Sequence, residues 1–347
     1  MGTNGSGKSS AFDVIHRMSR FINKEISLSE TFFNSDLTKW MDKKVQTYEL
    51  DIKTENGIYK YRLLVEFTDN RQKSRVKEEV LKLDDITLFS SKEGTANLYD
   101  DNGNLGANVL FDWTQSGVGA IQERDENRKL IYFKRFVENI VVVRPMPNLI
   151  QSVSQEEKSR LSLHMENFAA WYRYLVMENS SVIVDLSKEL PESLPGFVTL
   201  NSVLSGEARV LKVEFRSSEK GKKQTYTFSS LSDGQKMIIA IYALIIGNKG
   251  KNASLFIDEP DNFISIDEIQ PWLRLFIDDC GEGASLEQVV LISHHPEIID
   301  YSALGIPIWF EREPESHTRI KHVGKGIVDS SKPLLTLSQT IARGLVE

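Results

Sequence analysis

Residues 2–9 constrain the fold of this chain more than any later stretch, because they read Gly-Thr-Asn-Gly-Ser-Gly-Lys-Ser. They fit G-x-x-x-x-G-K-[ST], a pattern in which glycines let backbone N–H groups curl around a phosphate. Apolar residues recur at helical spacing as far as Phe21, which predicts a helix from Ser9 to about that residue. A glycine-rich loop at a helix N-terminus binds anions, so this stretch predicts a phosphate-binding loop, or P-loop.

Roles within the loop follow from the chemistry of its side chains. Lys8 would reach the β- and γ-phosphates of a nucleotide, and the Ser9 hydroxyl would hold Mg²⁺. The candidate nucleotide-binding residues run from the loop into the helix: Asn4, Gly5, Ser6, Gly7, Lys8, Ser9 and Ser10. A P-loop normally follows a buried strand, whereas Met1 immediately precedes this one. Either the start is truncated or misassigned, or a strand from elsewhere takes that place; a flexible glycine-rich start is the alternative reading.

Composition limits the class of protein that can contain this P-loop. The chain has 347 residues, enough for two domains or for one large domain with an inserted lobe. Its net charge of −7 argues against a chain-wide cationic surface, although a local basic patch is still allowed. Cys280 is the only cysteine, which excludes an intramolecular disulfide and disfavours a cysteine-based zinc site. No apolar run approaches the roughly 20 residues that span a bilayer, and the N-terminus lacks a signal pattern, so we expect a cytoplasmic protein without membrane contact.

The first half of the chain changes from helical to alternating periodicity. Residues 1–45 hold the P-loop and the first helices, and residues 46–110 predict an antiparallel β subdomain, with strands at 48–53, 59–67, 76–83 and 86–90. Turn signals separate the strands at Glu55-Asn56-Gly57 and Asp69-Asn70. One hairpin carries a basic cluster, for which a solvated strand edge is favoured over a nucleic-acid contact: Arg71, Lys73, Arg75 and Lys77.

Residues 111–205 predict a helical insertion around one buried strand at 140–143, with helices at 117–138, 154–179 and 182–190. Residues 206–347 begin with a strand pair and then alternate between helix and strand. The predicted strands are 210–216, 225–228, 254–257, 288–293, 306–310 and 318–323; the helices are 232–247, 267–279, 334–345 and a start at 296–299. Such alternation predicts a second ATPase lobe with a mainly parallel sheet and helices on both faces.

An apolar strand that ends in Asp258-Glu259-Pro260 is the second motif. It places Asp258 at the carboxyl edge of a sheet, where such folds bind ligands. Asp258 would complete the Mg²⁺ site that Ser9 begins, and Glu259 would accept a proton from the water that attacks the γ-phosphate. A strand that merely leads into an acidic turn is the alternative.

Two further motifs surround that strand. In Leu231-Ser-Asp-Gly-Gln-Lys, Ser232 is a natural N-cap and Gly234 permits close backbone approach, so this helix end, with Gln235, is another candidate anion site. The apolar strand at 289–292 delivers His294 to the same edge as Asp258, where it could contact a γ-phosphate or the attacking water. Either motif alone fits an ordinary capped helix or a structural histidine. Their order after the P-loop favours one composite nucleotide site.

This ordered set resembles the motifs of ABC-type ATPases. Residues 2–9 match Walker A, 231–235 the signature motif, 255–259 Walker B, and Ser293-His294 the switch histidine. The details look most like the soluble RecF, SMC and OLD-like branch, and within it like bacterial ATPases of anti-phage defence. Further features fit that group: Asp261-Asn262, His295-Pro296, Arg144-Pro145 and residues 167–169.

The resemblance implies an α/β fold, namely a P-loop NTPase of ABC type with a mainly parallel sheet flanked by helices, an antiparallel β subdomain and a helical insertion. It implies ATP and Mg²⁺ as ligands and ATP hydrolysis to ADP and phosphate, with Glu259 and His294 as the catalytic residues. It also implies an ATP-sandwich homodimer or higher oligomer. In that dimer, the P-loop of one subunit faces Ser232, Gly234 and Gln235 of the other across the nucleotide.

Three classes of function compete. The leading hypothesis is an ATPase whose dimerisation controls a partner effector in trans, a nuclease or toxin, as in prokaryotic anti-phage systems. The alternative is a DNA-repair or chromosome-associated RecF/SMC-like ATPase that clamps DNA; the acidic net charge counts mildly against it. The third is a regulatory module whose P-loop does not bind nucleotide. A transporter subunit fits less well, because of the β subdomain and the Asp-Glu-Pro-Asp-Asn sequence.

Overall fold

A computed structural model describes residues 1–37, 43–67, 73–217, 221–280, 284–301, 306–313, 317–322 and 336–342. The chain divides into two compact units. Residues 1–13 together with 141–347 form the first, which we call the motif unit, and residues 14–140 form the second, which we call the meander unit.

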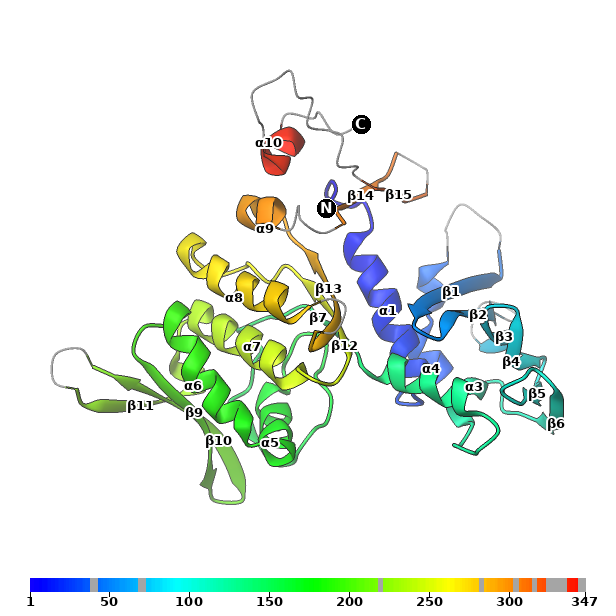
Figure 1. Ribbon diagram of the computed structural model, residues 1–347, viewed down its shortest axis with the longest axis horizontal. Coiled ribbons are helices and arrows are strands. Elements are labelled where there is room, and N and C mark those ends of the chain that lie inside the picture. The colour runs from blue at the N-terminus through cyan, green and yellow to red at the C-terminus, as the bar shows by residue number, and fades with distance from the viewer. Residues whose placement is uncertain are drawn as a thin grey trace. The chain divides into compact units, whose positions relative to one another are not determined.

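The meander unit is built on a six-stranded antiparallel sheet whose strands follow one another in sequence order (Figure 1). Its strands are β1 (Val45–Thr54), β2 (Gly57–Phe67), β3 (Ser74–Leu83), β4 (Ile86–Lys92), β5 (Thr95–Tyr99) and β6 (Leu105–Leu110). The four predicted strands are confirmed as β1 to β4. The sequence prediction missed β5 and β6. β6 is exposed along its whole length and has no alternation between apolar and polar faces. Asp69, Asn70 and Arg71 lie outside the described residues.

Short helices complete the meander unit: α2 (Leu28–Thr31), the 3-10 turn η1 (Asn34–Asp36), α3 (Gly117–Ala120) and α4 (Arg128–Glu138). In α4, apolar side chains at Leu130, Phe133 and Val137 recur on one face and are buried. The Phe133 ring lies 5.7 Å from that of Tyr59 and 5.8 Å from that of Tyr61, centroid to centroid. The alternating face of β2 and the apolar stripe of α4 therefore share one core.

The motif unit contains a parallel pair at its centre. β12 (Ala253–Asp258) pairs in parallel with β13 (Leu286–Ile292), and the sheet has the order β13-β12-β7, where β7 is Ile140–Val143. All six residues of β12 are buried, as expected for a strand covered on both faces. The α/β fold class with a parallel sheet, antiparallel sheets and flanking helices is confirmed. The parallel part of it is small among the described residues.

Two antiparallel sheets accompany that pair. One joins β8 (Val153–Ser154), β9 (Phe197–Ser205), β10 (Ala208–Arg216) and β11 (Lys223–Thr227), and the other pairs β14 (Ile308–Glu311) with β15 (Arg319–His322). The predicted pair at 210–216 and 225–228 is confirmed as β10 and β11, although Phe228 begins the 3-10 turn η3 (Phe228–Ser230) instead of ending the strand. The sequence prediction missed β9. Because this strand occupies the end of the predicted helical insertion at 111–205, that segment is less helical than expected.

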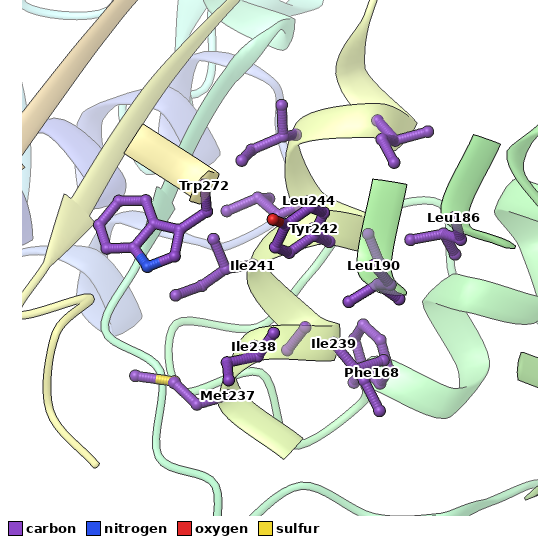
Figure 2. Close-up of a cluster of buried hydrophobic side chains, with 14 of the residues drawn as sticks. Phe168, Leu186, Leu190, Met237, Ile238, Ile239, Ile241, Tyr242, Leu244 and Trp272 are labelled. Atoms are coloured by element: carbon purple, nitrogen blue, oxygen red, sulfur yellow. The ribbon is translucent and has the colours of Figure 1, made fainter. Parts of the chain in front are cut away.

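Helices α5 (Phe168–Glu178), α6 (Ser181–Ser193), α8 (Ile266–Asp279) and α9 (Pro296–Tyr301) belong to the motif unit, as do α7 (Asp233–Asn248) and α10 (Leu337–Ala342). Every residue of α7 from Met237 to Asn248 is buried, because this helix is apolar on all sides. α5, α6 and α8 pack around it (Figure 1). Figure 2 shows Leu186 and Leu190 of α6 on one side of α7 and Trp272 of α8 on another. The predicted buried helix at 237–246 is thus the centre of the core.

Three helix predictions need correction. The stretch predicted at 117–138 is two helices, α3 and α4, separated by residues 121–127. α5 begins at Phe168 and not at residue 154, because Asn167 takes up the preceding turn: its side chain accepts from Ser162 N and donates to Arg160 O. α6 continues through Pro191 to Ser193, and Leu194 N still donates to Leu190 O at 2.8 Å. Of the predicted closing helix, residues 334, 335 and 343–345 lie outside the described range. No described helix combines the length and apolar character needed to cross a membrane.

Candidate functional site

The P-loop precedes α1 (Lys8–Ile22), the predicted first helix. Gly5 and Gly7 have φ angles of +76° and +93°, a left-handed backbone that favours glycine. Lys8 is 7% exposed, and its Nζ donates to the carbonyls of Gly2 at 2.8 Å and Thr3 at 3.0 Å. The lysine therefore lies folded over its own loop, with its ammonium group directed at the start of that loop.

A strand from elsewhere in the chain lies beside the start of the P-loop. Gly2 forms a parallel bridge with Phe310 of β14, and Phe310 N donates to Met1 O at 2.8 Å. Thr318 supports the other end of the loop: its Oγ1 donates to Ser6 O at 2.9 Å. A Cβ on Gly7 would lie only 2.8 Å from that same Oγ1. Residues far apart in sequence thus fix the path of the loop.

The carboxyl ends of β12 and β13 bring the second and fourth motifs together. Asp258 is aligned with Ile292, and Glu259 N donates to Ile292 O at 2.8 Å. Two residues further along, His294 is exposed at this edge, after the buried Ser293. The predicted meeting of Asp258, Glu259 and His294 at one sheet edge agrees with this register.

Lys8 lies within electrostatic range of that edge. Burial lowers the pKa of Lys8 from its usual 10.5, and the charges of Asp258 and Glu259 oppose this shift. The ammonium group is therefore held in a partly desolvated position opposite two carboxylates. This electrostatic interaction relates the P-loop to the Asp-Glu strand.

Asp258 itself is 2% exposed, and only one of its two carboxylate oxygens has a hydrogen-bond partner among the described residues. Its Oδ2 accepts from Arg144 Nε at 2.7 Å, whereas its Oδ1 has no hydrogen-bond partner among the described residues. A buried oxygen without a donor is costly unless a cation or water supplies the missing contact. Carboxylate and hydroxyl oxygens are the ligands that Mg²⁺ prefers, so Asp258 and Ser9 fit the ion that the resemblance implies.

Glu259 occupies a strained turn. Its φ is +53° and that of Phe263 is +73°, values that non-glycine residues rarely adopt. Asn262 Nδ2 donates to Glu259 Oε2 at 2.8 Å and so fixes the carboxylate. This restraint is what a proton acceptor at a defined position requires.

The signature helix end is organised by its own side chains. Ser232 Oγ accepts from Gln235 N at 3.3 Å, and Ser232 N donates to Gln235 Oε1 at 3.1 Å, which confirms the predicted N-cap as a full capping box. A Cβ on Gly234 would lie 2.6 Å from Phe263 O, so the glycine admits the turn after Glu259. The sequence predicts a ligand at this close approach, whereas the structure has the backbone carbonyl of Phe263 there.

The remaining predicted residues lie on the loop and the first turn of α1. Asn4, Gly5 and Ser10 are exposed, Ser9 is half-buried, and Ser6 is buried with an unpartnered Oγ. No hydrogen bond or ion pair between described residues joins Ser9 to Asp258, His294 to the P-loop, or Ser232 to the P-loop. Within one chain, then, the electrostatic interaction of Lys8 with Asp258 and Glu259 is what relates the predicted residues to one another.

Sequence reasoning assigned no role to four residues that support the site: Asp13, Arg144, Asn262 and Thr318. Arg144 and Asn262 had been noted only as features of the resemblance, without a role. Asp13 carried a weak signal, since it stands one turn beyond the P-loop on the new helix. Thr318 gave no signal, because its contact depends on strand pairing across the motif unit.

Comparisons with known proteins extend this picture. Residues 146–300, less than half of the chain, match the family model described as "AAA domain, putative AbiEii toxin, Type IV TA system". The match includes the signature, Asp-Glu and histidine motifs and indicates an ATPase domain. No curated protein matches the chain.

Solved structures with a similar fold are SMC head domains. One, an SmcHead bound to the C-winged helix domain of ScpA, is 15% identical at a TM-score of 0.48, and the alignment covers 93% of this chain and 89% of that one. Another, a Pyrococcus furiosus Smc head with an extended coiled coil bound to the C-terminal domain of ScpA, is 14% identical at a TM-score of 0.43, with 99% and 91% covered. The assignment of the site rests on the geometry of its own residues.

Proposed function

We propose that this chain binds Mg²⁺·ATP at the P-loop and hydrolyses it at the edge formed by β12 and β13. The observation that carries the proposal is the Arg144 bridge between Asp13, on the helix that follows the P-loop, and Asp258. The charges of Asp258 and Glu259, about 250 residues away in sequence, also act on the buried Lys8. Phosphate charge would replace the loop carbonyls as the partner of the Lys8 ammonium group.

Each residue has a task in this reaction. Asp258 and Ser9 hold the metal, which neutralises charge on the phosphates when it is bound. Glu259, held by Asn262, accepts the proton of the attacking water, and His294 donates a hydrogen bond at the γ-phosphate side. Gly5 and Gly7 keep the backbone N–H groups turned toward the phosphates.

ATP turnover tests this proposal. The native chain should release phosphate from ATP, whereas Glu259→Gln should retain nucleotide binding and lose turnover. Lys8→Ala should lose both. Binding without turnover in the native chain would contradict hydrolysis, and an absence of binding would contradict the site itself.

We further propose that ATP closes a dimer. Support comes from the exposed Ser232 end of α7, which makes no contact with the P-loop of its own chain among the described residues. A helix N-terminus of this kind can accept phosphate from a second subunit. ATP would then act as a switch on an interface, closing it when bound and opening it after hydrolysis.

Two matched variants separate this role from helix capping. Ser265 precedes α8 as Ser232 precedes α7: Ser265 N donates to Glu268 Oε2 at 3.1 Å, as Ser232 N donates to Gln235 Oε1 at 3.1 Å, although only Ser232 adds a side-chain cap hydrogen bond. In a Glu259→Gln background, light scattering with ATP should show a dimer for Ser265→Arg and a monomer for Ser232→Arg. Equal dimerisation of the two variants would contradict the sandwich.

The biological role that we propose is control of a partner effector in anti-phage defence. Its support is the combination of the sequence resemblance and a family model whose description names a toxin system. Phage challenge of cells that carry this gene with its genomic neighbours should show protection that Glu259→Gln abolishes. Equal plating efficiency with and without the genes would contradict this role.

The DNA-clamp alternative gains no support from the basic cluster. Arg75 Nη2 and Lys77 Nζ lie 2.6 and 2.8 Å from the Glu66 carboxylate. Hydrogen bonds from both lower the pKa of Glu66, so one carboxylate offsets part of the charge of these two cations locally. Both residues lie on β3, an interior strand between β2 and β4, so the strand edge predicted for them is wrong. Their ion pairs with Glu66 still favour a local role over a nucleic-acid contact.

A further inference from the structure

Arg144 pairs with Asp258, the candidate Mg²⁺ ligand. It follows β7 directly, and its Nε lies 2.7 Å from Asp258 Oδ2. Its Nη2 lies 3.4 Å from Asp13 Oδ1 on α1. One guanidinium group therefore bridges the candidate metal ligand and a second carboxylate.

The backbone of Arg144 is fixed, so any change must come from its side chain. Arg144 N donates to Leu163 O at 2.6 Å, and Arg144 O lies 3.1 Å from His164 Nδ1. A rotation of the side chain is enough to shift the guanidinium between its two carboxylates, because both already lie within reach.

The two carboxylates differ in their surroundings. The Asp258 side chain is 2% exposed, whereas that of Asp13 is 33% exposed. A buried carboxylate without a cation is strongly destabilising, but a half-exposed one is solvated by water. Without a metal, Asp258 therefore has the greater need of Arg144.

We infer that Arg144 is the resident counter-ion of Asp258 in the nucleotide-free chain and that Mg²⁺·ATP displaces it onto Asp13. Two cations beside one buried carboxylate repel each other at short range, so metal and guanidinium compete for Asp258. Arg144 is thus a positioning residue that keeps the empty site intact and sets the Mg²⁺ concentration needed to load it. This inference rests on the proposed nucleotide site.

Opposite shifts from two variants test the competition. In a Glu259→Gln background, binding of a fluorescent ATP analogue is measured while Mg²⁺ is titrated. Arg144→Gln removes the competitor and should lower the half-saturating Mg²⁺ concentration roughly fivefold, the low end of typical site couplings. Asp13→Asn removes the second position of the guanidinium and should raise that concentration about twofold to threefold.

Arg173 supplies the matched control. Its side chain is 22% exposed and pairs with Glu157 at 2.5 Å, away from the P-loop and Asp258. The exposure of Arg144 is similar at 27%. Arg173→Gln should leave the Mg²⁺ requirement unchanged, which separates competition at Asp258 from the general loss of an ion pair.

A second measurement needs no nucleotide. In EDTA, Arg144→Gln should melt at a lower temperature than the native chain, because Asp258 is left unpaired. Mg²⁺ alone should then raise the melting temperature of Arg144→Gln by more than it raises that of the native chain. An equal gain in both would overturn the inference.

The outcomes distinguish the two proposals. If the parent chain binds no ATP analogue at all, the proposed function fails, and the melting series still decides whether Arg144 and Mg²⁺ compete. If the parent binds with Mg²⁺ but Arg144→Gln needs as much Mg²⁺ or more, only this inference fails. If Arg144→Gln does not fold, a lowered or unchanged Mg²⁺ requirement in Asp13→Asn overturns it, and a raised one supports it.

Discussion

Among the residues that the structure describes, each unit buries one carboxylate, and the surroundings of the two are opposite. Glu79 in the meander unit is 0% exposed and Asp258 in the motif unit is 2% exposed. Glu79 Oε1 accepts from Tyr61 Oη at 2.8 Å and Ser116 Oγ at 2.7 Å, and Oε2 accepts from Gly117 N at 2.6 Å. Asp258 has Arg144 on one oxygen and no partner on the other among the described residues.

The hydrogen-bond partners of the two carboxylates distinguish them, whereas their burial does not. Neutral donors surround Glu79 and hold β2, β3 and the start of α3 together, which is a structural task. Asp258 keeps one oxygen open and has a cation that can be replaced, which is the condition of a ligand site. Satisfied hydrogen bonds, and not depth, separate the structural carboxylate from the one that we propose as a metal ligand.

Replacing Asp258 should have the largest effect on activity and a small one on stability. Asp258→Asn should lower ATP turnover by about a thousandfold, because metal-borne charge stabilisation is lost. The free energy of unfolding should change by less than about 1 kcal/mol, since the amide leaves no buried charge unpaired. Phosphate release and chemical denaturation measure the two quantities. A large loss of stability with intact turnover would make Asp258 the structural carboxylate.

Replacing Glu79 should do the reverse. Glu79→Ala leaves Tyr61, Ser116 and Gly117 without their acceptor and should cost about 4 kcal/mol in the free energy of unfolding. Urea denaturation followed by circular dichroism measures this loss. Nucleotide binding at a temperature where the variant is folded should remain. If Glu79→Ala unfolds no more easily than Asp258→Asn, the comparison fails.

The sequence predicted the place of Asp258 better than the burial of Glu79. Asp258 ends a run of apolar residues and stands in a recognisable motif, so its place at the sheet edge could be argued from the strand alone. Glu79 stands in β3 between charged and apolar neighbours, and its burial arises where Gly117, 38 residues later, packs against it. Such a contact depends on tertiary pairing that local periodicity does not encode.

The same limit applies within the site. The P-loop and the capping box of α7 are local patterns, and both could be predicted. Arg144 reaches Asp258 across 114 residues and Thr318 reaches Ser6 across 312, so neither contact has a local signal. The edge strand β6 was missed for a different reason: exposure of both faces removes the alternation by which strands are recognised.

The pH dependence of stability offers a second test of Glu79. Burial raises its pKa above the ordinary value of 4.5, against the opposing effect of its hydrogen bonds. The folded state therefore binds this proton more readily than the unfolded state does. The resulting stabilisation is fully present below pH 4.5 and is lost as the pH rises through the folded pKa.

Glu79→Gln isolates that contribution, because its amide does not titrate. The free energy of unfolding of the native chain, minus that of Glu79→Gln, should be larger at pH 5 than at pH 8. Denaturation of both proteins at the two pH values gives this difference directly. A difference that does not change with pH would show that the Glu79 proton is bound equally in both states.

Removing a single donor should have the smallest effect. Tyr61→Phe deletes one hydrogen bond to Glu79 Oε1, while Ser116 Oγ still donates to the same oxygen. The ring remains in place against Phe133, 5.8 Å away between centroids, so packing is preserved. The cost should therefore be about 1 kcal/mol in the free energy of unfolding. If Tyr61→Phe cost as much as Glu79→Ala, the Glu79 carboxylate would depend on one donor, and its contrast with the half-satisfied Asp258 would largely disappear.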